Sequence, residues 1–192
     1  PLRRVNNGVP SLPVSNVDSV RVTLVAETFL PSVNGVVNSV LQAADQLARN
    51  GHEPVVLAPT GASFTSISGH PVPVVTVASR SLAGYRGLRI ARPGLELDGV
   101  LRELAPDVVH LASPATLGWA AVQAAHRLEL PTVAVFQTDL SGFVRRYHLG
   151  AAAPALWAGL RRLHNLADLT LVPSSAAAYQ LRAHGIGPLA TW

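Results

Sequence analysis

Short apolar runs alternate with longer amphipathic segments along most of this chain. The first clear run, residues 20–26, is nearly continuous in apolar and β-branched residues, which is typical of a strand buried on both faces. From about residue 36 to 50 the apolar residues recur at helical spacing, and Gly51 stands where a left-handed helix stop is expected. This alternation continues to the C-terminus and predicts parallel strand–helix–strand units.

The same pattern predicts the later elements. Further strands are expected at 54–58, 72–77, 88–91, 108–111, 132–136 and 169–172. Further helices are expected at 97–104, 114–128, 154–166 and 175–183. Ser113 is the expected N-cap of the helix at 114–128, and Ser174 that of the helix at 175–183. The predicted fold class is therefore α/β, a Rossmann-like, doubly wound and mainly parallel sheet in the order 3-2-1-4-5-6. Residues 1–18, rich in Pro, Asn and Ser, are expected to form a flexible lead-in to one domain at 19–192.

In such a sheet, ligands bind beyond the carboxyl ends of the strands, where the strand order reverses. The residues of interest that follow the first strand and the strands at 108–111 and 132–136 are Glu27, Thr28, Asn34, Gly35, Ser113, Gln137, Thr138 and Asp139. A helix that begins near Gly35 offers free N–H groups to an anion, although the glycine could equally serve only the turn. Glu27 could bind a ligand hydroxyl or cap a loop, and residues 137–139 could bind sugar hydroxyls or only stabilise their own loop.

Composition excludes several classes of site. The chain has no cysteine, so a disulfide framework, a thiolate metal site and a cysteine nucleophile are excluded. The seven histidines lack metal-ligand spacing, and HExxH, GxSxG and GxGxxG patterns do not occur, so neither a metal nor a dinucleotide cofactor is expected and no catalytic residue is identified. The net charge of +4 comes from arginines that are spread along the chain, which argues against nucleic-acid binding.

Two pairs of arginines lie close to aromatic residues in the C-terminal third. Arg145 and Arg146 precede Tyr147, while Arg161 and Arg162 follow Trp157. This combination could form a surface for anionic lipid or other anions, or it could be an ordinary solvated helix face. No apolar run is long enough to span a membrane, and residues 1–18 do not resemble a secretory signal.

Five segments carry a family resemblance, in order along the chain from residue 20 onward: VAETFLPSVNGVVNSV, LARNGHEPVVLAP, PDVVHLASPATLGWAA, PTVAVFQTDLSGFVRRY and LADLTLVPS. They resemble the N-terminal domain of retaining GT-B glycosyltransferases of family four. Within that family they look most like actinobacterial GDP-mannose-dependent α-mannosyltransferases. The resemblance implies one half of a GT-B fold, with a C-terminal donor domain outside these residues.

The resemblance also implies roles for individual residues. Asn34, Gly35 and Val36 match the loop that approaches the donor diphosphate and the transferred sugar. Gln137 and Asp139 match the second donor loop, although many relatives have His where this chain has Gln137.

Glu27, Ser113 and Tyr147 are expected on the acceptor side. The acceptor implied is a lipid-linked molecule or glycolipid, and the donor implied is a sugar nucleotide, the GDP-mannose of the resembling group.

The implied activity is transfer of a hexose with retention, in a cytoplasmic protein that can contact the inner face of the plasma membrane. The isolated chain is expected to be inactive, because the family's nucleotide-binding groups lie in its second domain. A non-catalytic sugar- or lipid-binding module is an alternative. A nucleotide-sugar epimerase or dehydrogenase is a third reading, which the missing dinucleotide fingerprint disfavours.

Overall fold

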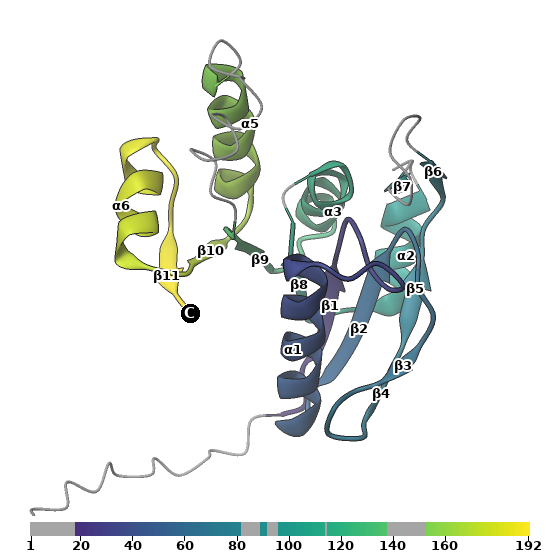
Figure 1. Ribbon diagram of the computed structural model, residues 1–192. Helices are drawn as coiled ribbons and strands as arrows, with labels where there is room; N and C mark the ends of the chain where they lie inside the picture. The colour runs from purple at the N-terminus through teal and green to yellow at the C-terminus, as the bar shows by residue number, and fades with distance from the viewer. Residues whose placement is uncertain (1–17, 82–88, 92–95, 114, 138–152) are drawn as a thin grey trace, which may run out of the picture.

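The computed structural model describes residues 18–81, 89–91, 96–113, 115–137 and 153–192 (Figure 1). Within them, a parallel seven-stranded sheet has the order β11-β10-β9-β8-β1-β2-β5. Its strands are β1 (Arg21–Val25), β2 (Glu53–Ala58), β5 (Val74–Thr76), β8 (Val108–Leu111), β9 (Thr132–Val135), β10 (Leu169–Val172) and β11 (Leu189–Thr191). Two antiparallel pairs lie outside this sheet: β3 (Phe64–Thr65) with β4 (Pro71–Val72), and β6 (Ser79–Ser81) with β7 (Arg89–Ala91).

Helices cover both faces of the sheet, as Figure 1 shows for α1 and α2 on either side of β2. They are α1 (Gly35–Arg49), α2 (Glu96–Leu104), α3 (Thr116–Arg127), α5 (Ala153–Leu166) and α6 (Ser175–Ala183). Consecutive residues of β1 point into different layers: Leu24 packs in one cluster with Val37 of α1, and Val25 in another with Leu101 of α2 and Leu117 of α3. This two-sided burial explains why the β1 sequence is apolar without alternation.

The predicted fold class and strand order are confirmed, with β11 as one further strand at the sheet edge. Gly51 has φ +81° and Gly185 has φ +71°. Both therefore adopt the left-handed conformation that commonly ends a helix and that glycine adopts most easily. Ser174 caps α6 as predicted, since its Oγ accepts a hydrogen bond from the Ala177 N–H at 3.2 Å.

Two local predictions are wrong, and one strand was not predicted. Ser113 does not cap the third helix, because α3 begins at Thr116 after Ala115, which makes no side-chain cap bond. The predicted strand at 72–77 is divided between β4, which contains Val72, and β5. The strand β11 was not predicted, since its three residues carry too short an apolar pattern.

Candidate functional site

The loops after β1 and β8 open at the point where the strand order reverses. β1 is hydrogen-bonded to β2 on one side and to β8 on the other. From β1 the chain passes through α1 to β2, whereas from β8 it passes through α3 to β9 in the opposite direction. In open α/β sheets, this reversal is where ligands bind.

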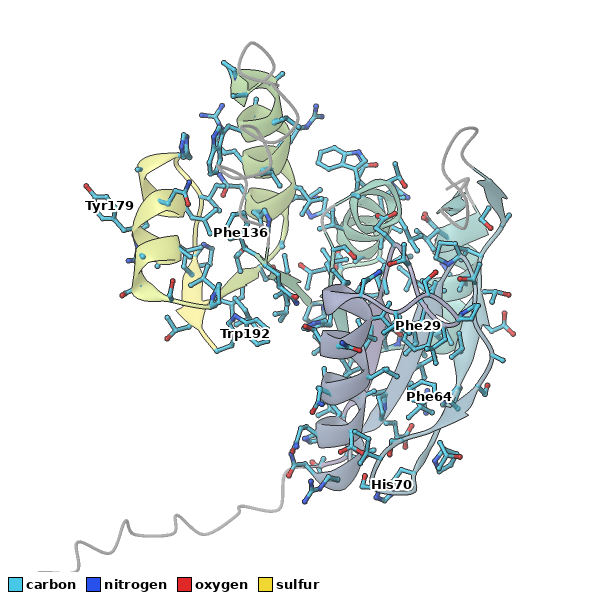
Figure 2. All side chains as sticks on the ribbon, in the orientation of Figure 1. Phe29, Phe64, His70, Phe136, Tyr179 and Trp192 are labelled. Carbon is cyan, nitrogen blue, oxygen red and sulfur yellow. The ribbon has the colours of Figure 1, made fainter. Side chains whose placement is uncertain are left out.

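The loop between β1 and α1 is anchored by Phe29. Its side chain is fully buried and packs against Phe64 of β3, with ring centroids 5.6 Å apart (Figure 2). Gly61 provides the space, because a Cβ at that position would lie 3.0 Å from the Phe29 ring. The loop therefore holds a defined position before α1 begins.

Asn34 organises the N-terminus of α1. Its Oδ1 accepts a hydrogen bond from the Val37 N–H at 3.0 Å, and its Nδ2 donates to Thr28 Oγ1 at 3.1 Å. The N–H groups of a first helical turn have no acceptor within the helix, and the helix dipole places partial positive charge there. The arrangement is suited to an anion such as a phosphate.

Gly35 is the first residue of α1, and the fold does not require a glycine there. Its φ lies outside the positive range recorded for Gly51 and Gly185, and a Cβ built on it would meet nothing within 4 Å. The reading that Gly35 only makes the turn therefore has no support. The missing side chain leaves the first-turn amides open to close approach from outside.

Gln137, which lies just after β9, contacts Ser39, one turn into α1. The Ser39 hydroxyl lies 3.0 Å from the Gly35 carbonyl oxygen and 3.1 Å from Gln137 Oε1. Because a serine hydroxyl has one proton, it can donate only one of these two hydrogen bonds at a time. The structure thus brings together Gly35 and Gln137, which are far apart in sequence and which the resemblance assigned to one ligand.

Glu27 and Ser113 meet beside the N-terminus of α3. The Glu27 N–H donates to Ser113 Oγ at 3.3 Å, and the Glu27 carboxylate accepts from Thr116 Oγ1 at 3.0 Å and from the Gly118 N–H at 2.9 Å. Burial raises the pKa of Glu27 above its ordinary 4.5, and the hydrogen bonds from α3 oppose that shift. The Glu27 carboxylate therefore caps the N-terminus of α3; an acceptor-binding role stays a prediction.

The remaining predicted residues are not drawn to this edge by described contacts. Thr138, Asp139, Arg145, Arg146 and Tyr147 lie outside the described residues. Arg161 and Arg162 are exposed on α5.

Arg162 lies over the Trp119 ring of α3, 5.4 Å from its centroid. Trp157 instead stacks on His184, with the two ring centroids 3.6 Å apart. The two arginines of α5 therefore have different aromatic neighbours.

Two buried histidines are neutral at physiological pH. Burial lowers the pKa of His110 and of His164 to about 4 each. His164 is fully buried, with Nδ1 3.0 Å from Thr170 Oγ1. Among the residues that the structure describes, no cluster of His, Asp or Glu could hold a metal ion.

Thr28 was expected at this edge, and its hydroxyl accepts from Asn34 within the same loop. Sequence reasoning missed Ser39 and Thr116, whose hydroxyl groups contact Gln137 and Glu27. Helical spacing gave a weak signal for Ser39, which lies one turn after Gly35. Thr116 acts on Glu27, which only the tertiary fold brings close. In the described part of the chain, no helix is long and apolar enough to cross a bilayer.

The parallel sheet is Rossmann-like, and at its switch point a helix begins with a glycine. Rossmann-like domains that bind phosphorylated ligands have this arrangement. Residues 33–192 match the family described as Glycosyltransferase Family 4, and the chain belongs to that family.

Curated relatives agree with this assignment. The chain is 47% identical over 175 residues to a GDP-mannose-dependent alpha-mannosyltransferase of Mycolicibacterium smegmatis, covering 90% of this chain and 47% of the relative. It is 44% identical over 174 residues to a protein of the same name from Corynebacterium glutamicum, covering 90% of this chain and 42% of the relative. The chain thus spans about half the length of the curated relatives it matches.

The solved structures show the same half-coverage. Sucrose-phosphate synthase from Thermosynechococcus elongatus superposes with a TM-score of 0.62 at 13% identity, over 90% of this chain and 47% of that structure. At this identity the likeness shows the fold alone. It confirms the prediction of a Rossmann-like sheet that forms one half of a GT-B fold.

Proposed function

We propose that this chain forms the N-terminal, acceptor-side half of a retaining glycosyltransferase that transfers mannose from GDP-mannose to a lipid-linked or glycolipid acceptor. The observation that carries the proposal is the N-terminus of α1, where Gly35 has no side chain to cover the Gly35 and Val36 amides and where Gln137 lies beside Ser39, one turn further along. The donor and the reaction are taken from the names of the curated relatives, to which 90% of the chain aligns.

The chemistry proposed for this edge is positioning and charge stabilisation. In sugar transfer from a nucleotide, negative charge grows on the departing diphosphate, and fixed N–H groups lower the barrier if they point at that charge. The first turn of α1 is proposed to supply such N–H groups, and the hydrogen bonds of Asn34 hold this turn without a ligand. Gln137, whose Oε1 lies 3.1 Å from Ser39 Oγ, is proposed to contact the transferred sugar.

One helix terminus is too weak to hold the donor alone. It contributes about 0.3–1 kcal/mol in an exposed setting. Millimolar binding already requires about 4 kcal/mol. The rest must come from the half of the relatives that this chain does not span, so the proposed site lies between two domains.

The acceptor side is proposed around Ser113 and Tyr147, beyond the ends of β8 and β9. Ser113 Oγ accepts from the backbone of Glu27 and keeps its own proton available to a ligand oxygen. Contact with a lipid surface is proposed through exposed Arg161 and Arg162 together with Arg145 and Arg146, at the cytoplasmic face of the membrane. Arg161 lies beside the stacked pair of Trp157 and His184, in the lining of one shallow pocket.

The proposal is tested by a titration of the isotopically labelled chain with GDP-mannose, followed by amide NMR. Shifts should be largest at Gly35, Val36 and Gln137 and should not saturate below millimolar donor. GDP-glucose serves as the control for the sugar, and GMP for the diphosphate. Shifts confined to residues away from this edge would contradict the proposed donor site.

A non-catalytic sugar- or lipid-binding module is the alternative. It would share the shifts but would give no sugar transfer when the chain is completed by a second domain. Turnover in the completed protein therefore separates the two functions.

A further inference from the structure

Two helices present their N-termini at the switch point, one on each face of the sheet. α1 begins at Gly35 and has its own side-chain cap, Asn34. α3 begins at Thr116, and Ala115 before it supplies no side-chain cap. By charge alone, both termini would attract an anion.

The N-terminus of α3 is already filled by a carboxylate of the same chain. Glu27 Oε1 accepts from the Gly118 N–H at 2.9 Å, and Oε2 accepts from Thr116 Oγ1 at 3.0 Å. Gly118 and Thr116 lie 91 and 89 residues after Glu27 in the sequence. Glu27 thus replaces the local N-cap that α3 lacks and brings a negative charge to its positive end.

The close approach of α3 to this carboxylate depends on Gly118. A Cβ at Gly118 would lie 2.2 Å from the Ser113 carbonyl oxygen and 3.9 Å from Glu27 Oε1. The Ser113 side chain in turn accepts from the Glu27 N–H. Three positions, 27, 113 and 118, are therefore fitted to one another, and they join the loop after β1 to the loop after β8.

We propose that Glu27 is a positioning residue, an internal anion that closes the N-terminus of α3 and leaves the N-terminus of α1 as the anion-binding terminus of this edge. The inference rests on the proposed function, because it explains how a donor diphosphate is directed to Gly35. Glu27 acts through α3 and through the loop that carries Gly35, and it does not contact the diphosphate.

Chemical rescue tests the capping role. Glu27→Ala removes the carboxylate and should lower Tm by about 2–4 °C. Sodium formate should restore part of this loss of Tm, because formate can bind the vacated position in the folded protein but not in the unfolded chain. Sodium chloride at equal ionic strength should not restore it. The control is Glu103→Ala on exposed α2, which should show no formate-specific effect. Glu27→Gln, which fills the same space, should not be rescued.

Pyrophosphate tests the directing role. In the wild-type chain, pyrophosphate should shift the amide signals of Gly35, Val36 and Val37 and leave Gly118 unchanged. In Glu27→Ala the shifts should extend to Thr116 and Gly118. If the alanine variant does not fold, the wild-type titration and the Glu27→Gln variant still decide the question.

Shifts at Gly118 in the wild type, or equal effects of formate and chloride on Glu27→Ala, would overturn the inference. The proposed function fails differently: GDP-mannose would then cause no shift at Gly35, while formate rescue still decides whether Glu27 caps α3. The two failures can therefore be distinguished.

Discussion

Replacing Gly35 with valine separates ligand contact from folding. The structure places open space where the new side chain would go, with nothing within 4 Å of its Cβ. Gly35 is also the first residue of α1, where the backbone loses no hydrogen bond on substitution. The free energy of unfolding should therefore change by no more than about 0.5 kcal/mol. This corresponds to a Tm change of about 2 °C or less.

The effect on the donor should be much larger. A valine side chain at Gly35 covers the first-turn amides and displaces a phosphate oxygen from them. A hydrogen bond to a charged group contributes about 1.5–3 kcal/mol. Its loss corresponds to about a 10–150-fold fall in kcat/KM or in donor affinity.

The assay requires a completed protein. We suggest a joined polypeptide, in which residues 1–192 are followed by the C-terminal half of the Mycolicibacterium smegmatis relative, with transfer of labelled mannose measured at several donor concentrations. The matched control is Gly99→Val, at an exposed glycine of α2 that also has nothing within 4 Å of a built Cβ. Loss of activity in the control alone, or unchanged kcat/KM in Gly35→Val, would refute the reasoning.

Three further predictions follow from the described contacts. Gly118→Ala forces a Cβ to 2.2 Å from the Ser113 carbonyl oxygen, and overpacking should lower Tm by about 2–12 °C; Gly159→Ala, with open space around it, should leave Tm unchanged or raise it in the same thermal scan. Hydrogen bonds from Ser68 lower the pKa of Asp45 below 3.8, and those from Thr132 do the same for Asp168. The two carboxylates therefore contribute fully to the free energy of unfolding above that pH, and their contribution is lost as the pH falls through their folded-state pKa values. Urea unfolding between about pH 5 and pH 2 should show this loss, with a smaller pH dependence in Asp45→Asn; an equal dependence in the variant would count against it. Arg161→Gln with Arg162→Gln should weaken salt-sensitive binding to anionic vesicles, while Arg49→Gln, at the far end of α1, should not; equal binding by the double variant would remove these arginines from the lipid surface.

The sequence predicted the elements whose signals are local. β8 and β10 have the predicted bounds, because each is a short apolar run between turn residues. α6 is also correct, since Ser174 and Gly185 mark its two ends. The strand order was expected because 3-2-1-4-5-6 is the common order of a doubly wound sheet, the class that the element sequence and right-handed crossovers predict.

What the sequence could not predict depends on partners distant along the chain. Ser113 before a helical pattern predicted an N-cap, but Glu27 of the loop after β1 satisfies α3 instead and Ser113 binds the Glu27 backbone. The hairpin of β3 and β4 was missed because two-residue strands have no periodicity, and its turn is held by Asp45 of α1 through Ser68. Proximity of Gln137 to the start of α1 was expected from the sheet, since both follow carboxyl ends of strands at the switch point, and from the family resemblance; the link through Ser39 was not predicted.

Transfer of labelled mannose from GDP-mannose, measured side by side for the 192-residue chain and for the joined polypeptide, tests the central claim most directly. The account predicts transfer to a lipid-extract acceptor by the joined polypeptide and none by the chain alone, because the N-terminus of α1 is proposed to supply only part of the donor site. Robust mannose transfer by the 192-residue chain would contradict it. So would a folded joined polypeptide that neither hydrolyses GDP-mannose nor transfers mannose from it.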